Sequence, residues 1–284
     1  MFKFWLAWRY LNSCGNFLNL TSGLALLGMI LGVASLVVSM AVVSGYESTL
    51  RRAVIDVVGH LLIIKRGQTI KGSEEVEKSM RPLVNGYQAH TPFVVVEAVL
   101  AHNKKITGVI IEGADPESVH KVLNLKSRLL PGGAFDLGFK DDLPNALIGK
   151  GLAEKFDLKV GDVFRVVTPQ TSGYNREKFR PRLQRFNVVG VLSLGRYDYD
   201  QRFILTNILA AQDFAEIGEQ ITGVRIKVDK DRDAIMAATA INSDSESAYW
   251  ARSWEAANRN LFAAVKYEKP IIFLVIFIIV VAAA

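Results

Sequence analysis

Residues that could carry out chemistry are few and scattered in this sequence. The single cysteine, Cys14, excludes an internal disulfide bond and a zinc site built from cysteines. The histidines at positions 60, 90, 102 and 120 are isolated, and none has a partner at the spacing of metal ligands. The stretch GKGLAEK (149–155) resembles part of a phosphate loop, but it lacks the earlier glycine and the Ser or Thr after the lysine. We therefore expect no catalytic residue, no metal site and no cofactor.

One long basic stretch, PQTSGYNREKFRPRLQRF (169–186), is better suited to binding than to catalysis. It lies between two predicted strands, DVFRVVTP (162–169) and FNVVGVLSL (186–194), where hairpin loops usually have about two to five residues. It carries five Arg or Lys against one Glu, together with Tyr174, Phe179 and Pro181. Aromatic area and cationic charge on a stiff loop are typical of a docking surface for a partner protein. A mobile, solvated hairpin is the alternative interpretation.

The overall composition indicates a membrane protein and argues against nucleic-acid binding. Half of the residues are apolar, and the mean hydropathy is positive. The net charge is +6, but the basic residues are interleaved with 28 acidic ones, and no nucleic-acid-binding motif accompanies them. We attribute the excess of positive charge to local patches and to segments next to a membrane.

The first apolar segment predicts a transmembrane helix. Residues 10–46 contain no charge, and their centre, 20–43, would span about 36 Å as a helix. We place the helix at 20–44, after an amphipathic segment, 1–19, that lies in the membrane interface. The only charges before the helix are Lys3 and Arg9, so the positive-inside rule puts the N-terminus in the cytoplasm.

Two further features concern the membrane. Small residues recur on one face of the predicted helix at spacings of four, three and four, which favours close packing of another helix; they are Gly28, Gly32, Ser35 and Ser39. The alternative is that transmembrane helices are generally rich in glycine. The last segment, 269–284, is apolar but too short to cross a membrane comfortably. We interpret it as the start of a second transmembrane helix, in which case the sequence is the front part of a longer membrane protein.

The residues between these segments predict an α+β domain outside the cytoplasm. Its two ends, 45–114 and 216–268, should pack as one membrane-proximal subdomain of βαβ type, because both are anchored at the membrane. The middle, 115–215, should be an inserted, mainly-β subdomain from which the basic hairpin protrudes. The strands expected at the two ends lie at 57–67, 91–102, 105–114, 223–229 and 247–254, with helices at 74–84, 232–241 and 255–268.

Three stretches carry a family resemblance. They are RYLNSCGNFLNLTSGLALLGMILGVASLVVSMAVVSGYESTLR, ALIGKGLAEKFDLKVGDVFRVVTP and LFAAVKYEKPIIFLVIFIIVVAAA. They resemble the LolC/LolE lipoprotein-releasing permeases, which are part of the MacB-like group of ABC transporter membrane subunits. The resemblance covers essentially the whole chain. It implies a multi-pass protein of the bacterial inner membrane with a periplasmic domain and no enzyme activity of its own.

The resemblance also implies partners and site residues. The expected partners are a LolD-like ATPase, a second permease subunit (a homologue or another copy), a LolA-like periplasmic carrier, the lipoprotein substrate and membrane lipid. The hairpin corresponds to a hook that docks the carrier, through Arg165, Tyr174, Arg176, Phe179, Arg180, Pro181, Arg182, Gln184 and Arg185. A cleft for the acyl chains would be formed by Met40, Val43, Tyr46, Ile271, Leu274 and Ile278.

Two questions stay open at this point. The Gln-Arg pair before the return strand, Gln184-Arg185, lies one position later than in LolC. Because one residue changes the face of a strand, the sequence leaves open which of Arg182, Gln184 and Arg185 meets the carrier. The alternative functions are a MacB-like efflux or mechanotransmission permease and an FtsX-like adaptor that regulates cell-wall enzymes.

Overall fold

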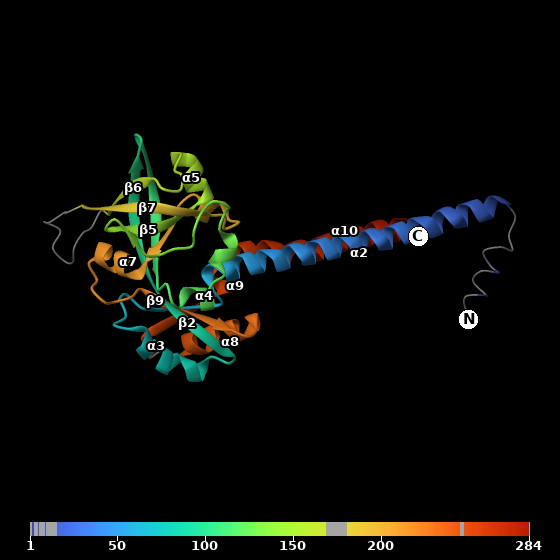
Figure 1. Cartoon of the computed structure of the whole chain (residues 1–284). Helices are drawn as coiled ribbons and strands as arrows, with labels where there is room; N and C mark the ends of the chain where they lie inside the picture. Colours follow the sequence, from blue (N-terminus) through green and yellow to red (C-terminus); the bar gives the residue numbers. More distant parts are fainter. Residues whose placement is uncertain are drawn as a thin grey trace. The chain divides into compact units, whose positions relative to one another are not determined.

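The computed structural model describes residues 2, 5, 9, 16–168, 181–244 and 247–283 (Figure 1). The chain divides into two compact units. The first consists of Met1–Arg51 and Asn258–Ala284 and holds most of helix α2 (Asn16–Val58) and helix α10 (Arg259–Ala283). The second, Arg52–Ala257, is the α+β domain.

Helix α2 is longer than the predicted transmembrane helix. Its segment Gly23–Val58 is long and apolar enough to cross a membrane, and it is the one such helix in the described part of the chain. The boundary predicted at residue 44 is not a helix end, because α2 continues to Val58 and stops at Gly59, whose φ of +85° is the left-handed conformation that ends helices. The strand predicted from residue 57 is therefore wrong in its first residues. Val54, Val57 and Val58 are buried at helical spacing, and strand β1 (Leu61–Lys65) starts after the glycine.

Helix α10 combines two segments that the sequence analysis treated separately. The short helix α9 (Trp254–Ala257) precedes it, and α10 then runs through Pro270 without a break. Residues 259–268 of the predicted helix and the apolar segment from 269 onward thus belong to one continuous helix, whereas residues 255–257 belong to α9.

The N-terminal and C-terminal parts of the α+β domain share one antiparallel sheet of order β10-β1-β9-β2. Each part contributes a strand–helix–strand unit, and the two units interleave as in a ferredoxin-like split βαβ fold. The sheet joins segments from both ends of the domain. The segment 105–114, which was predicted for the same subdomain, is not one of its four strands. Its further elements are α3 (Ser73–Met80), the 3₁₀ helix η1 (Arg81–Leu83), β2 (Tyr87–His102), β9 (Gly223–Val228), α8 (Asp231–Ser243) and β10 (Tyr249–Ser253).

Strand β2 continues beyond this sheet and becomes part of a closed ring. Its first half pairs with β9 and its last residues pair with β6, while β3 lies along its other edge. The order β2-β3-β8-β5-β7-β6 therefore closes on itself through the β2–β6 pairing. The ring strands are β3 (Lys105–Ala114), β5 (Leu143–Gly149), β6 (Val163–Thr168), β7 (Arg182–Leu192) and β8 (Phe203–Asn207), with β4 (Phe139–Lys140) paired to β5.

Short helices complete the ring region and cover its strands. Helix α7 packs against β2 and β3, and its first turn is capped by the side chain of Asn207, which accepts a hydrogen bond from the Leu209 amide. Aromatic rings join α7 to the ring strands: Phe164 stacks on Phe186 at 5.7 Å, and Phe214 meets Phe186 edge-on at 6.5 Å. The helices are α4 (Val119–Val122), η2 (Leu125–Arg128), α5 (Lys150–Phe156), α6 (Tyr197–Asp200) and α7 (Ile208–Ala215).

The glycines of the GKGLAEK stretch have a packing role. A Cβ atom on Gly149 would lie 2.4 Å from the carbonyl oxygen of Asp200, and one on Gly151 would lie 2.5 Å from the side-chain nitrogen of Gln201. The stretch ends β5 and begins α5, and only glycine allows α6 to approach this closely. Close backbone packing therefore accounts for the two glycines that suggested a phosphate loop.

A buried ion pair links the four-stranded sheet β10-β1-β9-β2 to the ring. Arg225 on β9 donates two hydrogen bonds to the carboxylate of Glu112 on β3, and both side chains are almost fully buried. The guanidinium also lies over the ring of Phe93 on β2, 4.5 Å from its centroid. Because β2 runs between β9 and β3, the pair crosses the strand that both layers share.

Candidate docking surface on the hook strands

The two strands that carry the basic hairpin, β6 and β7, define the candidate site. Their register pairs Phe164 with Phe186 and Arg165 with Arg185, and pairing continues to Thr168 opposite Arg182. Strand β7 therefore starts at Arg182, four residues earlier than the return strand predicted at 186. The hook boundary of 169–186 needs correction, because its last residues are strand residues held by this antiparallel ladder. Residues 169–180 lie outside the described part of the chain.

One face of the strand pair points toward the core. Phe164, Val166 and Phe186 are fully buried on it. Arg182 belongs to this face, since it lies opposite the buried Thr168. Its guanidinium donates to Asp213 on α7 at 2.7 Å and to Glu216, the residue that follows α7, at 3.2 Å. Arg182 is thus engaged within the protein and holds the start of β7 against α7.

The opposite face of the strand pair is exposed. It presents Arg165 and Arg185 directly opposite each other, and neither guanidinium has a hydrogen-bond or ion-pair partner among the described residues. Around them lie the half-buried Val167 and two large apolar side chains, Val163 and Leu183, which are 43% and 55% exposed. We call these five residues the hook-strand face. Like charges directly opposite each other destabilise a sheet, so their placement is explained by binding better than by folding.

The predicted hook residues thus differ in where their side chains lie. Arg165 and Arg185 lie on the exposed face, while Arg182 is directed to α7. Gln184 is half-buried on the core side, and its side chain donates to the carbonyl oxygen of Arg185. Pro181 is exposed and precedes β7. Tyr174, Arg176, Phe179 and Arg180 are outside the described residues.

Sequence reasoning overlooked the apolar residues of the hook-strand face. Val163 and Leu183 alternate with buried residues along their strands, so the period of two contained the signal. Val163 lies in the predicted strand 162–169 and Leu183 in the predicted hook 169–186, but neither side chain was assigned to an exposed face from the sequence.

The predicted membrane residues are placed in the first unit. On α2, Gly28, Gly32 and Ser39 are half-buried along with Met40 and Val43, while Ser35 and Tyr46 are exposed. On α10, Ile271, Leu274 and Ile278 are exposed, and the half-buried residues of that stretch are Ile272 and Ile276. The half-buried face of α2 therefore combines three of the four small residues with the two predicted cleft residues that come next along the helix, and Ser35 is not part of it.

Among the described residues, no group of three or more His, Cys, Asp or Glu side chains is arranged to hold a metal ion. The polar chemistry of the hook-strand face is limited to two guanidinium groups, which bind carboxylates and other anions. Together with the exposed Val163 and Leu183, these groups can contact a partner that offers anionic and apolar groups.

Residues 22–244 match the family of the MacB-like periplasmic core domain. The chain belongs to this family. The match begins within helix α2 and ends just after α8. It includes the ring with its hook strands and the strands β1, β9 and β2 of the four-stranded sheet, but not β10.

Curated relatives extend the match over almost the whole chain. A LolC protein of Neisseria meningitidis, named as a lipoprotein-releasing system transmembrane protein, is 29% identical and aligns with 99% of this chain and 67% of its own length. A LolC of Xylella fastidiosa is 27% identical, with 97% of this chain and 66% of its own length aligned. A LolE of Haemophilus influenzae is 23% identical, with 98% and 67% aligned.

These relatives confirm the resemblance drawn from the sequence. The chain is a LolC/LolE-like permease sequence of the MacB superfamily, and it spans about two thirds of the length of the curated relatives that it matches. Both LolC and LolE names occur among them. The predicted fold class, an apolar N-terminal helix followed by a MacB-like α+β domain, is confirmed as well.

Proposed function

We propose that this chain is a membrane subunit of an ABC transporter that extracts lipoproteins from the inner membrane and passes them to a periplasmic carrier docked on the hook strands. The observation that carries the proposal is the hook-strand face. It combines two exposed guanidinium groups, which have no ion-pair partner in the described part of the chain, with two exposed apolar side chains on an antiparallel strand pair in a LolC/LolE-like chain. Such a face suits an acidic protein partner with apolar contact points.

The hook strands β6 and β7 are held in place by the rest of the domain, which also favours the proposal. The hook strands are anchored by the stacked Phe164 and Phe186 beneath them and by the ion pairs of Arg182 with α7. A docking surface that is already ordered loses little conformational entropy when a partner binds. The fixed orientation of Arg165 and Arg185 therefore favours binding over a merely solvated hairpin.

On the membrane side, we assign α2 and α10 to the path of the acyl chains. Met40 and Val43 lie on the half-buried face of α2, where a flexible thioether can adapt to chains of different shape. An apolar surface is needed there because each CH₂ exposed to water costs about 0.8 kcal/mol. In this proposal the N-terminus is cytoplasmic, the α+β domain is periplasmic, and the protein crosses the inner membrane more than once.

Energy would come from a separate ATPase subunit. The 284 residues contain no Walker motif, so we assign this chain the permease role, acting beside a second permease subunit that is a homologue or another copy. The chain would convert movements of its partners into expulsion of the lipoprotein, with no covalent chemistry of its own.

The proposal is tested by reversing the charge of the hook-strand face. In the full-length transporter, Arg165→Glu with Arg185→Glu should lower the affinity for the purified periplasmic carrier at least tenfold. The loss should lie mainly in the association rate and should shrink as salt is raised, as expected for exposed charges. Surface-bound carrier and a titration of solubilised transporter measure both quantities.

The matched control removes the same number of positive charges elsewhere. Lys121→Glu with Lys126→Glu, both exposed near α4 and η2, should leave capture unchanged. An equal loss in the control, or none in the test variant, contradicts the assignment. A photocrosslinker at Leu183 in cells separates the rival functions, since a crosslink to a cell-wall hydrolase or to an outer-membrane channel component would favour the adaptor or the efflux permease.

A further inference from the structure

The hook-strand face continues across two more strands of the ring. Residues that are directly opposite in register have side chains on the same face of a sheet. One lateral row therefore runs Arg185, Arg165, Ala101, Ile106 from β7 to β3, and the next runs Leu183, Val167, Val99, Gly108. Ile106 is 71% exposed, and Ala101 is exposed too. The exposed surface is thus cationic near the hook and apolar toward β3.

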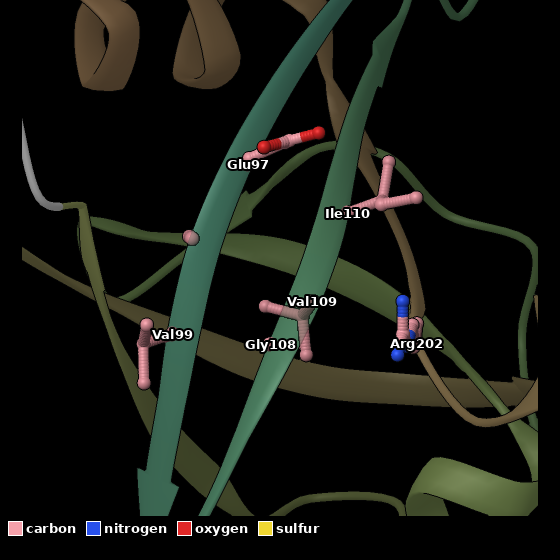
Figure 2. A pocket seen from close by; sticks show the side chains of 7 residues that line it. Glu97, Val99, Gly108, Val109, Ile110 and Arg202 are labelled. Atoms are coloured by element: carbon pink, nitrogen blue, oxygen red, sulfur yellow. The ribbon is translucent and has the colours of Figure 1, made fainter.

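A pocket of about 310 Å³ lies at the far end of this surface. Its walls come from Glu97 and Val99 on β2, Ile110 on β3 and Arg202 just before β8, as Figure 2 shows. Glu97 and Arg202 are both exposed, and neither side chain has a hydrogen-bond or ion-pair partner among the described residues. The volume is at the lower end of the range of about 300–1,000 Å³ for ligand pockets and is ample for one side chain.

The pocket exists because residue 108 is a glycine. Gly108 lies opposite Val99, where any other residue would project a side chain over the sheet. A Cβ atom at this position would meet nothing within 4 Å, and the backbone conformation does not require glycine. A glycine inside a strand weakens it and often marks a close approach by a ligand or another backbone. Neither close packing nor the backbone conformation explains why position 108 is a glycine.

We infer that the pocket at Gly108 receives an apolar side chain of the protein that docks on the hook-strand face. This inference rests on the proposed function and extends its interface from β7 to β3. The occupant is the periplasmic carrier, which would present carboxylates to Arg165 and Arg185 and an apolar side chain to the pocket. Beside that side chain it would present a cation to Glu97 and an anion to Arg202.

Continuity and charge favour a protein over a small molecule. The two lateral rows join the pocket to the paired arginines without a break, so one partner can cover both. The pocket mouth carries one charge of each sign, which complements a polypeptide surface with mixed charges. Apolar anchors that fill pockets, surrounded by polar contacts, are the usual source of affinity in protein interfaces.

Filling the pocket tests the inference. In the full-length transporter, Gly108→Leu should weaken binding of the purified carrier at least tenfold without lowering the melting temperature, because there is free space at this position and leucine is a better strand residue than glycine. Gly72→Leu is the matched control: it adds the same side chain at another glycine with open space, before α3, and should bind the carrier normally.

A second variant separates specific contacts from net charge. Glu97→Arg combined with Arg202→Glu keeps the charge of the chain but exchanges the two signs at the pocket mouth, so the carrier should bind at least tenfold more weakly. Normal carrier binding by both this variant and Gly108→Leu overturns the inference.

The outcomes also distinguish the inference from the proposed function. If reversal of Arg165 and Arg185 abolishes capture while both pocket variants bind normally, the proposed function stands and the pocket assignment fails. If the pocket variants instead lose association with the second permease subunit and still bind the carrier, the pocket belongs to a subunit interface and the inference is overturned.

Discussion

The ion pair between Glu112 and Arg225 offers the sharpest test of how the domain is held together. Both residues are almost fully buried, Glu112 at 4% and Arg225 at 6% exposure, and the guanidinium donates to both carboxylate oxygens. Replacing Arg225 with Met removes the cation, keeps an unbranched side chain over Phe93, and leaves the Glu112 carboxylate buried without its partner. Replacing Glu112 with Leu in addition removes this buried, unpaired carboxylate.

The expected change in the free energy of unfolding follows from the burial of the pair. Breaking a buried ion pair at one end typically costs about 3–5 kcal/mol, whereas exchanging the whole pair for apolar residues is often neutral or stabilising by about 1–4 kcal/mol. We therefore expect Arg225→Met to destabilise the domain by about 3–5 kcal/mol. For a domain of this size that lowers the melting temperature by about 6–20 °C. The double variant Glu112→Leu/Arg225→Met should recover most or all of the loss.

The assay is unfolding of the solubilised chain in urea and by heat, followed by the fluorescence of Trp250 and Trp254 in the domain. A double-mutant cycle gives the coupling between the two positions. The reasoning is refuted if Arg225→Met costs less than about 1 kcal/mol, the range of exposed pairs. It is also refuted if the double variant is as unstable as the single one.

Three further predictions concern other parts of the domain. Arg182→Ala should cost no more than about 1 kcal/mol in urea unfolding, because both of its acidic partners, Asp213 and Glu216, are largely exposed. Gly113→Val should destabilise by at least about 1–3 kcal/mol in the same assay, since a Cβ atom there would lie 2.3 Å from the Cβ of Ala211; wild-type stability would contradict the close packing of α7 on β3. Burial lowers the pKa of His60 from its ordinary 6.5, so the unfolded chain gains a proton first as the pH falls. The stability due to neutral His60 is present above about pH 6.5 and lost below it, and His60→Gln should reduce the fall in melting temperature between pH 7.5 and pH 5; an unchanged fall would refute this.

Local patterns predicted most elements of the fold. Alternating apolar residues located the strands at 91–102, 105–114 and 223–229, and the observed β2, β3 and β9 agree within a few residues. The two ends of the domain share one sheet, to which each contributes a complete strand–helix–strand unit, but the strand at 105–114 joins the ring and not the subdomain predicted for it. The end of α2 was missed because Val54, Val57 and Val58 fit a strand and a helix equally well until burial distinguishes them.

The closure of the ring could not be predicted, since it depends on contacts between distant strands. Pairing of Val99 with Val167 places β6 next to β2, and no local pattern in either strand specifies this partner. The faces of Arg182 and Arg185 were undetermined for a related reason. The register of β7 is fixed by its ladder with β6 and by α7, neither of which can be read from the intervening loop.

The residues that local rules explain worst are the ones that lie together on the exposed face. Arg165 opposite Arg185 sets like charges against each other, and Gly108 weakens a strand at a position with room for any side chain. The strand pairing places the two arginines and Gly108 on one continuous surface, beside the exposed Leu183. Residues that lower the stability of the fold therefore lie together on one surface, above a tightly packed core. This pattern is expected where residues are selected for binding and not for folding.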